Sequence, residues 1–208
     1  GQRIAYLSDA SDEYELVLAD QTGLKAKETI SLNGPGFYYG LRWSPDGTKL
    51  LYTDKALHLY YIDLEERQPV LVDTDTYDHP RRSLSPVWSP DSAWIAYTKR
   101  LDTHIRAVFL YELASGACTQ ITDGLSDATD ACFDPAGRYL YFAASSNYGL
   151  NTGWLDMSSY ERSTLSHLYA AVLSADAPSP LAPESDDEPR PKSGGDQRGA
   201  DPSGQETG

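Results

Sequence analysis

The sequence predicts an all-β fold: a partial β-propeller of about four blades, each a four-stranded antiparallel meander. One pattern returns every 45 residues, as RWSPDGTKLLYT at 42–53, VWSPDSAWIAYT at 87–98 and CFDPAGRYLYFA at 132–143. An aromatic residue, a proline and an aliphatic residue keep this interval, in Trp43, Trp88 and Phe133, in Pro45, Pro90 and Pro135, and in Leu50, Ile95 and Leu140. A repeat of about 40–50 residues with four short strands is typical of propeller blades, which bury their sheets against one another.

The second copy shows the expected strands most clearly. Its apolar stretches are rich in Tyr, Leu, Val, Ile and Thr, which strands favour. Ser44-Pro45-Asp46-Gly47 predicts a tight turn, because proline presets the backbone, aspartate can bond the main chain and glycine allows a positive φ. The strands are expected at 40–44, 49–54, 57–64 and 69–74.

The remaining copies follow the same plan with departures at both ends of the chain. The first copy begins inside the repeat, since RIAYLSD at 3–9 aligns with a second strand, and we expect the chain to be a piece of a longer one. The fourth copy contains an aromatic insertion at 145–167, and its last strand is expected at 180–181 or not at all. The expected strands are 3–9, 14–20 and 27–32; 85–89, 94–100, 106–113 and 118–123; and 130–134, 139–145 and 167–174.

Composition limits the classes of function. The formal net charge of −14 argues against binding to nucleic acid or to an anionic membrane surface. Two cysteines are too few for a disulfide framework. Residues 182–208 are rich in Pro, Gly, Asp and Glu, so we expect an acidic disordered linker after a propeller region at 1–181.

Motifs for catalysis or for cofactors are not recognisable in the sequence, so we expect no catalytic residue, no cofactor and no metal site. Asp73, Asp75 and Asp78 are close enough in sequence to suggest calcium, but they lack the glycine and distal glutamate of an EF-hand loop. The alternative for this stretch is a solvated linker between blades.

The innermost strands, expected at 38–43, 83–88 and 128–133, would line the central channel of a propeller. Basic and acidic residues beside them suggest a channel lining of mixed charge, and arginine there could bind an anionic group such as a peptide C-terminus. Ordinary surface charge is the alternative. The candidates for contact with the channel or with a partner are Arg42, His79, Arg81, Arg82, Asp127 and Asp130.

The insertion at 145–167 adds two further candidates, Trp154 and Tyr160. Long loops in compact domains are often functional, and exposed aromatic side chains often mark an interface. Contact with another domain or subunit and packing against the same blade remain equal alternatives for this insertion.

The repeat and the end of the propeller region resemble a known family. The WSPDG phrase followed by KLLYT, at 43–53, resembles blades shared by TolB, prolyl-oligopeptidase-like enzymes and tricorn protease. YLYFAASSNYGL at 139–150, Trp154 in the insertion and LSHLYAAVLSADAPSPLAPESDDE at 165–188 resemble the last blade of the second propeller in tricorn-protease-like serine peptidases. The resemblance covers about residues 1–188.

The resemblance implies a non-catalytic propeller segment of a serine protease that degrades short peptides, acting as an access channel, a filter and a scaffold. The expected partners are peptides, other domains of the parent chain and further copies in a homo-oligomer, with neither nucleic acid nor membrane among them. A cytoplasmic location is expected, with the periplasm as the alternative. A TolB-like interaction propeller and the propeller of a prolyl-oligopeptidase-like enzyme are the alternative functions.

Overall fold

The computed structural model describes residues 3–32, 34, 36–78, 84–147, 151–152, 155–156, 165–180 and 182, and these residues form an all-β fold without a helix. Residues 1–177 form one compact unit. Residues 178–208 form a second, in which the described residues make a turn where the Ala182 amide donates to the Ser179 carbonyl over 3.0 Å. Most of the predicted linker at 182–208 lies outside the described residues.

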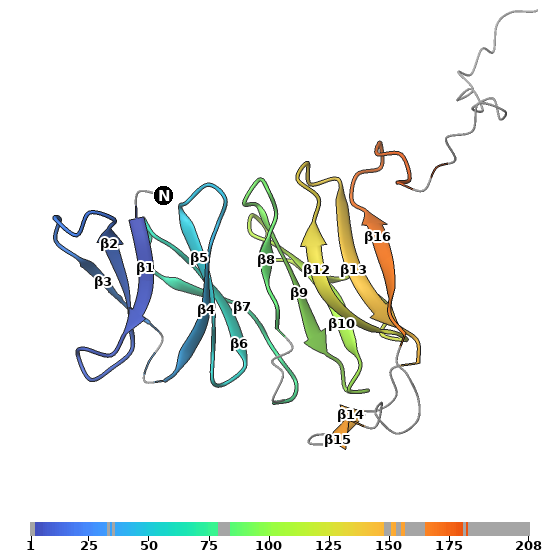
Figure 1. Cartoon of the computed structure of the whole chain (residues 1–208), viewed down its shortest axis with the longest axis horizontal. Helices are drawn as coiled ribbons and strands as arrows, with labels where there is room; N and C mark the ends of the chain where they lie inside the picture. Colours follow the sequence, from blue (N-terminus) through green and yellow to red (C-terminus); the bar gives the residue numbers. More distant parts are fainter. Residues whose placement is uncertain are drawn as a thin grey trace, which may run out of the picture. The chain divides into compact units, whose positions relative to one another are not determined.

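Four antiparallel sheets of three or four strands make up most of the first unit (Figure 1). The second and third sheets have four strands each, whereas the first and fourth have three among the described residues. The sheets contain β1 (Arg3–Ser8), β2 (Glu15–Asp20) and β3 (Glu28–Ser31); β4 (Tyr38–Trp43), β5 (Lys49–Asp54), β6 (His58–Asp63) and β7 (Pro69–Thr74); β8 (Val87–Trp88), β9 (Trp94–Arg100), β10 (Arg106–Glu112) and β11 (Cys118–Gln120); and β12 (Asp127–Phe133), β13 (Tyr139–Ser145) and β16 (His167–Val172).

The register of the strands confirms the 45-residue repeat. The repeating aromatic residues pair with the repeating aliphatic residues in the second, third and fourth copies, as Trp43 with Leu50, Trp88 with Ile95 and Phe133 with Leu140. β8 is shorter than the expected strand, because Pro86 precedes it and has no amide hydrogen to donate to a ladder.

The turn after each innermost strand explains the Ser-Pro-Asp motif. The Ser44 hydroxyl donates to the Asp46 carboxylate over 2.5 Å and accepts from the Lys49 amide over 2.9 Å, and Ser89 makes the same bonds with Asp91 and Trp94. In the fourth copy Asp134 accepts directly from the Tyr139 amide over 2.7 Å. A side chain at the first position therefore closes all three turns.

Successive sheets pack face to face through three interfaces, which we call the first, second and third seams. Figure 1 shows the sheets in a row, with the first and fourth at opposite ends, so they do not close into a ring. The repeating aromatics lie in the seams, as predicted. The buried groups include Leu16, Leu50 and Tyr52 in the first seam, Leu51, Ile95 and Tyr97 in the second, and Val108, Leu140 and Phe142 in the third.

The insertion in the fourth sheet leaves its ladder intact, because β13 pairs directly with β16. A short hairpin of β14 (Asn151–Thr152) and β15 (Leu155–Asp156) lies within it. The Asn147 side-chain oxygen accepts from the Ser145 hydroxyl and from the Leu165 amide, both over 3.0 Å, and so closes the base of the insertion. Within the described residues there is no helix of the length and apolarity needed to cross a membrane.

Candidate functional site

The innermost strands β4 and β12 carry a bulge at the same place in the repeat. The register of β4 shifts between Tyr39 and Arg42, and that of β12 shifts between Thr129 and Cys132. Gly40 and Asp130, two repeats apart, lie within these bulges with φ values of 67° and 55°. A bulge turns a side chain away from the regular ladder, and it often occurs next to a functional site.

Three side chains on these two strands are exposed in the described chain: Arg42 on β4, and Asp130 and Cys132 on β12. Arg42 and Cys132 are also two repeats apart, so both strands expose equivalent positions. Two of the predicted contact residues, one basic and one acidic, therefore lie exposed on innermost strands of the second and fourth sheets, with β8 of the third sheet between these strands in the order of the repeat.

Asp127, a third predicted contact residue, lies in a buried ion pair instead. Its side chain is 2% exposed, and it accepts two hydrogen bonds from the Arg106 guanidinium, over 3.0 and 2.5 Å. The same carboxylate accepts from the Arg106 amide over 3.0 Å. The pair joins β10 of the third sheet to β12 of the fourth, so this carboxylate connects two blades.

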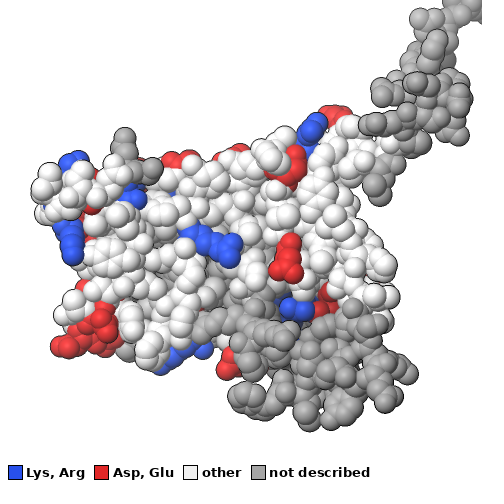
Figure 2. Space-filling view, in the orientation of Figure 1, with Lys and Arg blue, Asp and Glu red and all other residues white. Residues whose placement is uncertain are grey.

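The other predicted contact residues, His79, Arg81, Arg82, Trp154 and Tyr160, lie outside the described residues. The described residues on the face drawn in Figure 2 carry basic and acidic side chains as separate groups among uncharged ones. The net charge of −14 is therefore not gathered into one acidic patch on that face.

The acidic stretch considered for calcium has structural contacts. Asp73 accepts from the Tyr97 hydroxyl and from the Lys99 ammonium, both over 2.7 Å. Asp75 is buried and accepts from the Arg100 amide over 2.9 Å. These bonds attach the end of β7 to β9, and no group of three or more potential metal ligands occurs among the residues described.

The structure contains a polar cluster in the second seam that was not predicted from the sequence. The Tyr97 hydroxyl lies 2.9 Å from the Cys118 sulfur as well as donating to Asp73. Burial raises the pKa of Tyr97, and its hydrogen bonds with Cys118 and Asp73 raise it further. Cys118 is exposed as a residue, but partial desolvation of its sulfur raises the pKa of the thiol, which favours a protonated sulfur rather than a nucleophilic thiolate. The cluster therefore connects strands, and only the pairing of sheets brings its members together.

Comparison with known proteins confirms the resemblance seen in the sequence. The family model of the tricorn protease second β-propeller domain matches residues 1–206. The chain is 32% identical over 138 residues to a tricorn-like protease C-terminal subunit of Sulfurisphaera tokodaii, covering 66% of the chain and 15% of that protein. It is 31% identical over 102 residues to a tricorn protease homolog of Saccharolobus solfataricus, covering 49% of the chain and 9% of that protein.

Solved structures show the same fold. The crystal structure of the tricorn protease aligns with a TM-score of 0.68 at 15% identity, over 86% of this chain and 18% of the other. TolB from Acinetobacter baumannii aligns with a TM-score of 0.52 at 19% identity, over 85% of this chain and 40% of the other. The chain thus spans a small part of the proteins it resembles, and it belongs to the family of the tricorn protease second β-propeller domain.

Proposed function

We propose that this chain is a non-catalytic propeller segment of a tricorn-like serine protease and that it admits short peptides along its innermost strands. The proposal places the chain within a longer parent that forms a homo-oligomer and that carries its catalytic residues in other domains. Membership of the tricorn propeller family supports this assignment.

The observation that carries the proposal is the pair of bulged innermost strands. β4 and β12 expose a basic and an acidic side chain, Arg42 and Asp130, whereas their neighbours pack into the seams. Charged groups along a channel attract peptides of opposite sign and repel those of like sign, so they bias which peptides enter. Arg42 is expected to favour acidic peptides and Asp130 basic ones.

A binding experiment tests the proposal. Dye-labelled peptides of six residues, one acidic and one basic, are titrated with the chain at low salt and followed by fluorescence anisotropy. Arg42→Glu is expected to weaken binding of the acidic peptide at least threefold, and Asp130→Lys to weaken binding of the basic peptide by a similar factor. Each variant should have the opposite effect on the other peptide.

The matched control is Glu66→Lys, which changes the charge of an exposed turn residue between β6 and β7. It alters net charge as much as the test variants do, but its position is remote from the innermost strands in sequence and sheet order. If Glu66→Lys shifts binding of both peptides as much as Asp130→Lys does, and Arg42→Glu shifts it by the same factor in the opposite direction, the effect is one of net charge and the proposal fails. Binding of a folded protein in preference to both peptides would instead support the TolB-like alternative.

A further inference from the structure

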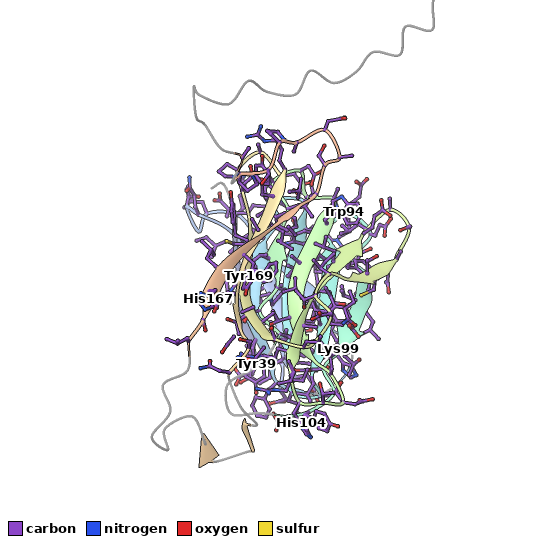
Figure 3. The ribbon with its side chains drawn as sticks, turned by 90° about the vertical axis from the view of Figure 1, so that its right-hand side faces the viewer. Tyr39, Trp94, Lys99, His104, His167 and Tyr169 are labelled. Atoms are coloured by element: carbon purple, nitrogen blue, oxygen red, sulfur yellow. The ribbon has the colours of Figure 1, made fainter. Side chains whose placement is uncertain are left out.

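A pocket opens within the third seam, between β9 and β10 of the third sheet and β12 of the fourth. Its volume is about 190 Å³, and Trp94, Leu110 and Phe133 line it together with Asp91 and Gly137. Pockets for drug-sized ligands have volumes of roughly 300–1,000 Å³, so this one has room for a single side chain. Figure 3 shows Trp94 at one end of β9, whereas Lys99 lies near the other end of this strand and His104 lies beyond it.

Comparison with the second seam explains why the pocket is open. There the position of Phe133 is taken by Trp88, whose indole donates to the Arg42 carbonyl over 3.2 Å. The position of Leu110 is taken by Tyr61, whose ring lies 6.5 Å from the Trp88 ring, centroid to centroid. Smaller side chains at both positions leave space in the third seam.

A third difference between the second and third seams lies in the turn that follows the innermost strand. Ser92 of the second seam accepts from the Asp46 amide over 3.1 Å, and its equivalent in the third seam is Gly137. The second seam is therefore filled by two rings and bridged by a hydroxyl, whereas the equivalent positions of the third seam hold the smaller ring of Phe133, an aliphatic side chain and a glycine.

The first seam shows which group fits such a space. Arg3 lies with its guanidinium carbon 5.6 Å from the centroid of the Trp43 ring and donates to the Gly47 carbonyl over 3.0 Å. Phe133 and Gly137 are the equivalents of Trp43 and Gly47 in the third seam. An aromatic ring and a turn carbonyl thus occupy the same repeat positions in the third seam, but the position of Arg3 is held by Trp94.

Asp91 adds a negative charge to this lining. Its Oδ1 accepts from the Ser89 hydroxyl over 2.5 Å and from the Ala93 amide over 3.1 Å. The hydrogen bond from Ser89, followed by that from Ala93, lowers the pKa of Asp91 despite partial burial, so the carboxylate is ionised at neutral pH. An ionised carboxylate beside aromatic rings favours a cation that can also stack.

We propose that the third-seam pocket binds the arginine side chain of a peptide, with its guanidinium against Phe133, donating to the Gly137 carbonyl and paired with Asp91. The inference goes beyond the proposed channel and concerns a different set of residues. The planar guanidinium suits this site because it stacks on a ring and donates hydrogen bonds at its edge.

The test compares three capped tripeptides, acetyl-Ala-Arg-Ala-amide, its citrulline analogue and its lysine analogue, by calorimetric titration of the chain at low salt. Citrulline keeps the shape of arginine and removes its charge. The arginine peptide is expected to bind at least tenfold more tightly than the citrulline peptide and more tightly than the lysine peptide. Equal affinity for arginine and citrulline, equal affinity for arginine and lysine, or no saturable binding of the arginine peptide up to about 10 mM would overturn the proposal.

Two variants assign the binding to the pocket. Asp91→Asn keeps an oxygen for Ser89 and Ala93 and is expected to weaken binding of the arginine peptide about tenfold, as expected for loss of a charge-assisted contact. Phe133→Trp places in the third seam the ring found in the second and should abolish binding. A folded variant of either kind that binds like the original chain would contradict the proposal.

Asp46→Asn is the matched control, since Asp46 is the equivalent of Asp91 in the turn of the second sheet and lies outside the pocket. It should leave the affinity for the arginine peptide unchanged. Arg42→Glu and Asp130→Lys separate the two proposals. Both proposals are supported if these variants lose the selectivity between acidic and basic peptides but still bind the arginine peptide in a way that depends on Asp91. Unchanged selectivity would contradict only the proposed channel, and loss of the dependence on Asp91 would contradict only the proposed pocket.

Discussion

The second and third seams are built from the same repeat but are held together differently. The second contains large rings and is bridged near the turns by Ser92 and by the Trp88 indole. The third contains a layer of alanines and is bridged by the buried pair of Arg106 and Asp127. The repeat thus determines strand register and turns, whereas each pair of neighbouring sheets is joined by its own side chains.

The largest expected effect is in the third seam. Arg106→Met keeps much of the aliphatic stem and leaves the 2%-exposed Asp127 carboxylate without its guanidinium. We expect the free energy of unfolding to fall by about 3–5 kcal/mol, because breaking a buried ion pair leaves an uncompensated charge. Urea denaturation followed by circular dichroism measures the change.

Two further variants check this explanation. Adding Asp127→Asn should recover part of the loss, since asparagine is neutral and can still accept from the backbone amide at position 106. Glu28→Ala removes the exposed pair with Arg67 and should cost less than about 1 kcal/mol. Equal losses for Arg106→Met and Glu28→Ala would show that the third seam does not depend on its buried pair.

Exchanging the seam aromatics is expected to have the next largest effect. Trp88→Phe gives the second seam the ring of the third and removes the hydrogen bond to the Arg42 carbonyl, so it should cost about 1–3 kcal/mol. Phe133→Trp places the larger ring beside a pocket of about 190 Å³, so it should change stability by less than about 1 kcal/mol. Thermal and urea unfolding of both variants measure this asymmetry, and equal and opposite changes would contradict it.

The sequence predicted the features that depend on neighbouring residues in a repeat. The pairing of Trp88 with Ile95 and the turn closed by Ser89 follow from the order of aromatic, turn and aliphatic residues, which fixes local geometry. The direct pairing of β13 with β16 across the insertion was predictable for the same reason.

The contacts across the seams were less predictable. Asp127 was expected among the channel residues, but a carboxylate near a strand end can face the channel or the next sheet, and only the position of Arg106 on that sheet decides. The cluster of Tyr97, Asp73 and Cys118 likewise depends on how two sheets pack. The five candidates outside the described residues remain predictions.

Acid should reduce the contribution to stability of the turns that border the second and third seams. Although partial burial opposes it, hydrogen bonding from Ser44 and Thr48 lowers the pKa of Asp46 from 3.8 to about 2, and the pKa values of Asp91 and Asp134 are also lowered. A folded pKa below the unfolded one gives stability that is present above pH about 4 and is lost as the pH falls toward 2.

The thermal midpoint measured between pH 7 and pH 2 tests this contribution. The midpoint is expected to fall between pH 4 and pH 2, and Asp46→Asn should reduce the size of that fall. The variant should be less stable than the original chain at pH 7 and should differ little from it at pH 2. A variant that loses the same stability at both pH values would show that the Asp46 charge does not contribute.

The smallest expected effect concerns the bulges of β4 and β12, where one strand has glycine and the other aspartate at the same repeat position. Asp130 adopts a φ of 55°, a region that costs an ordinary L-residue roughly 1–2 kcal/mol and that aspartate tolerates better than most residues. Asp130→Gly removes this strain but adds backbone freedom to the unfolded chain, so stability should change by less than about 1 kcal/mol.

Gly40→Ala should cost about 1 kcal/mol, because alanine has no side-chain group that compensates at a φ of 67°. Urea denaturation of both variants compares the two bulges, and a loss above 2 kcal/mol for Asp130→Gly would mean that this exposed carboxylate has a structural role on β12 rather than one in binding.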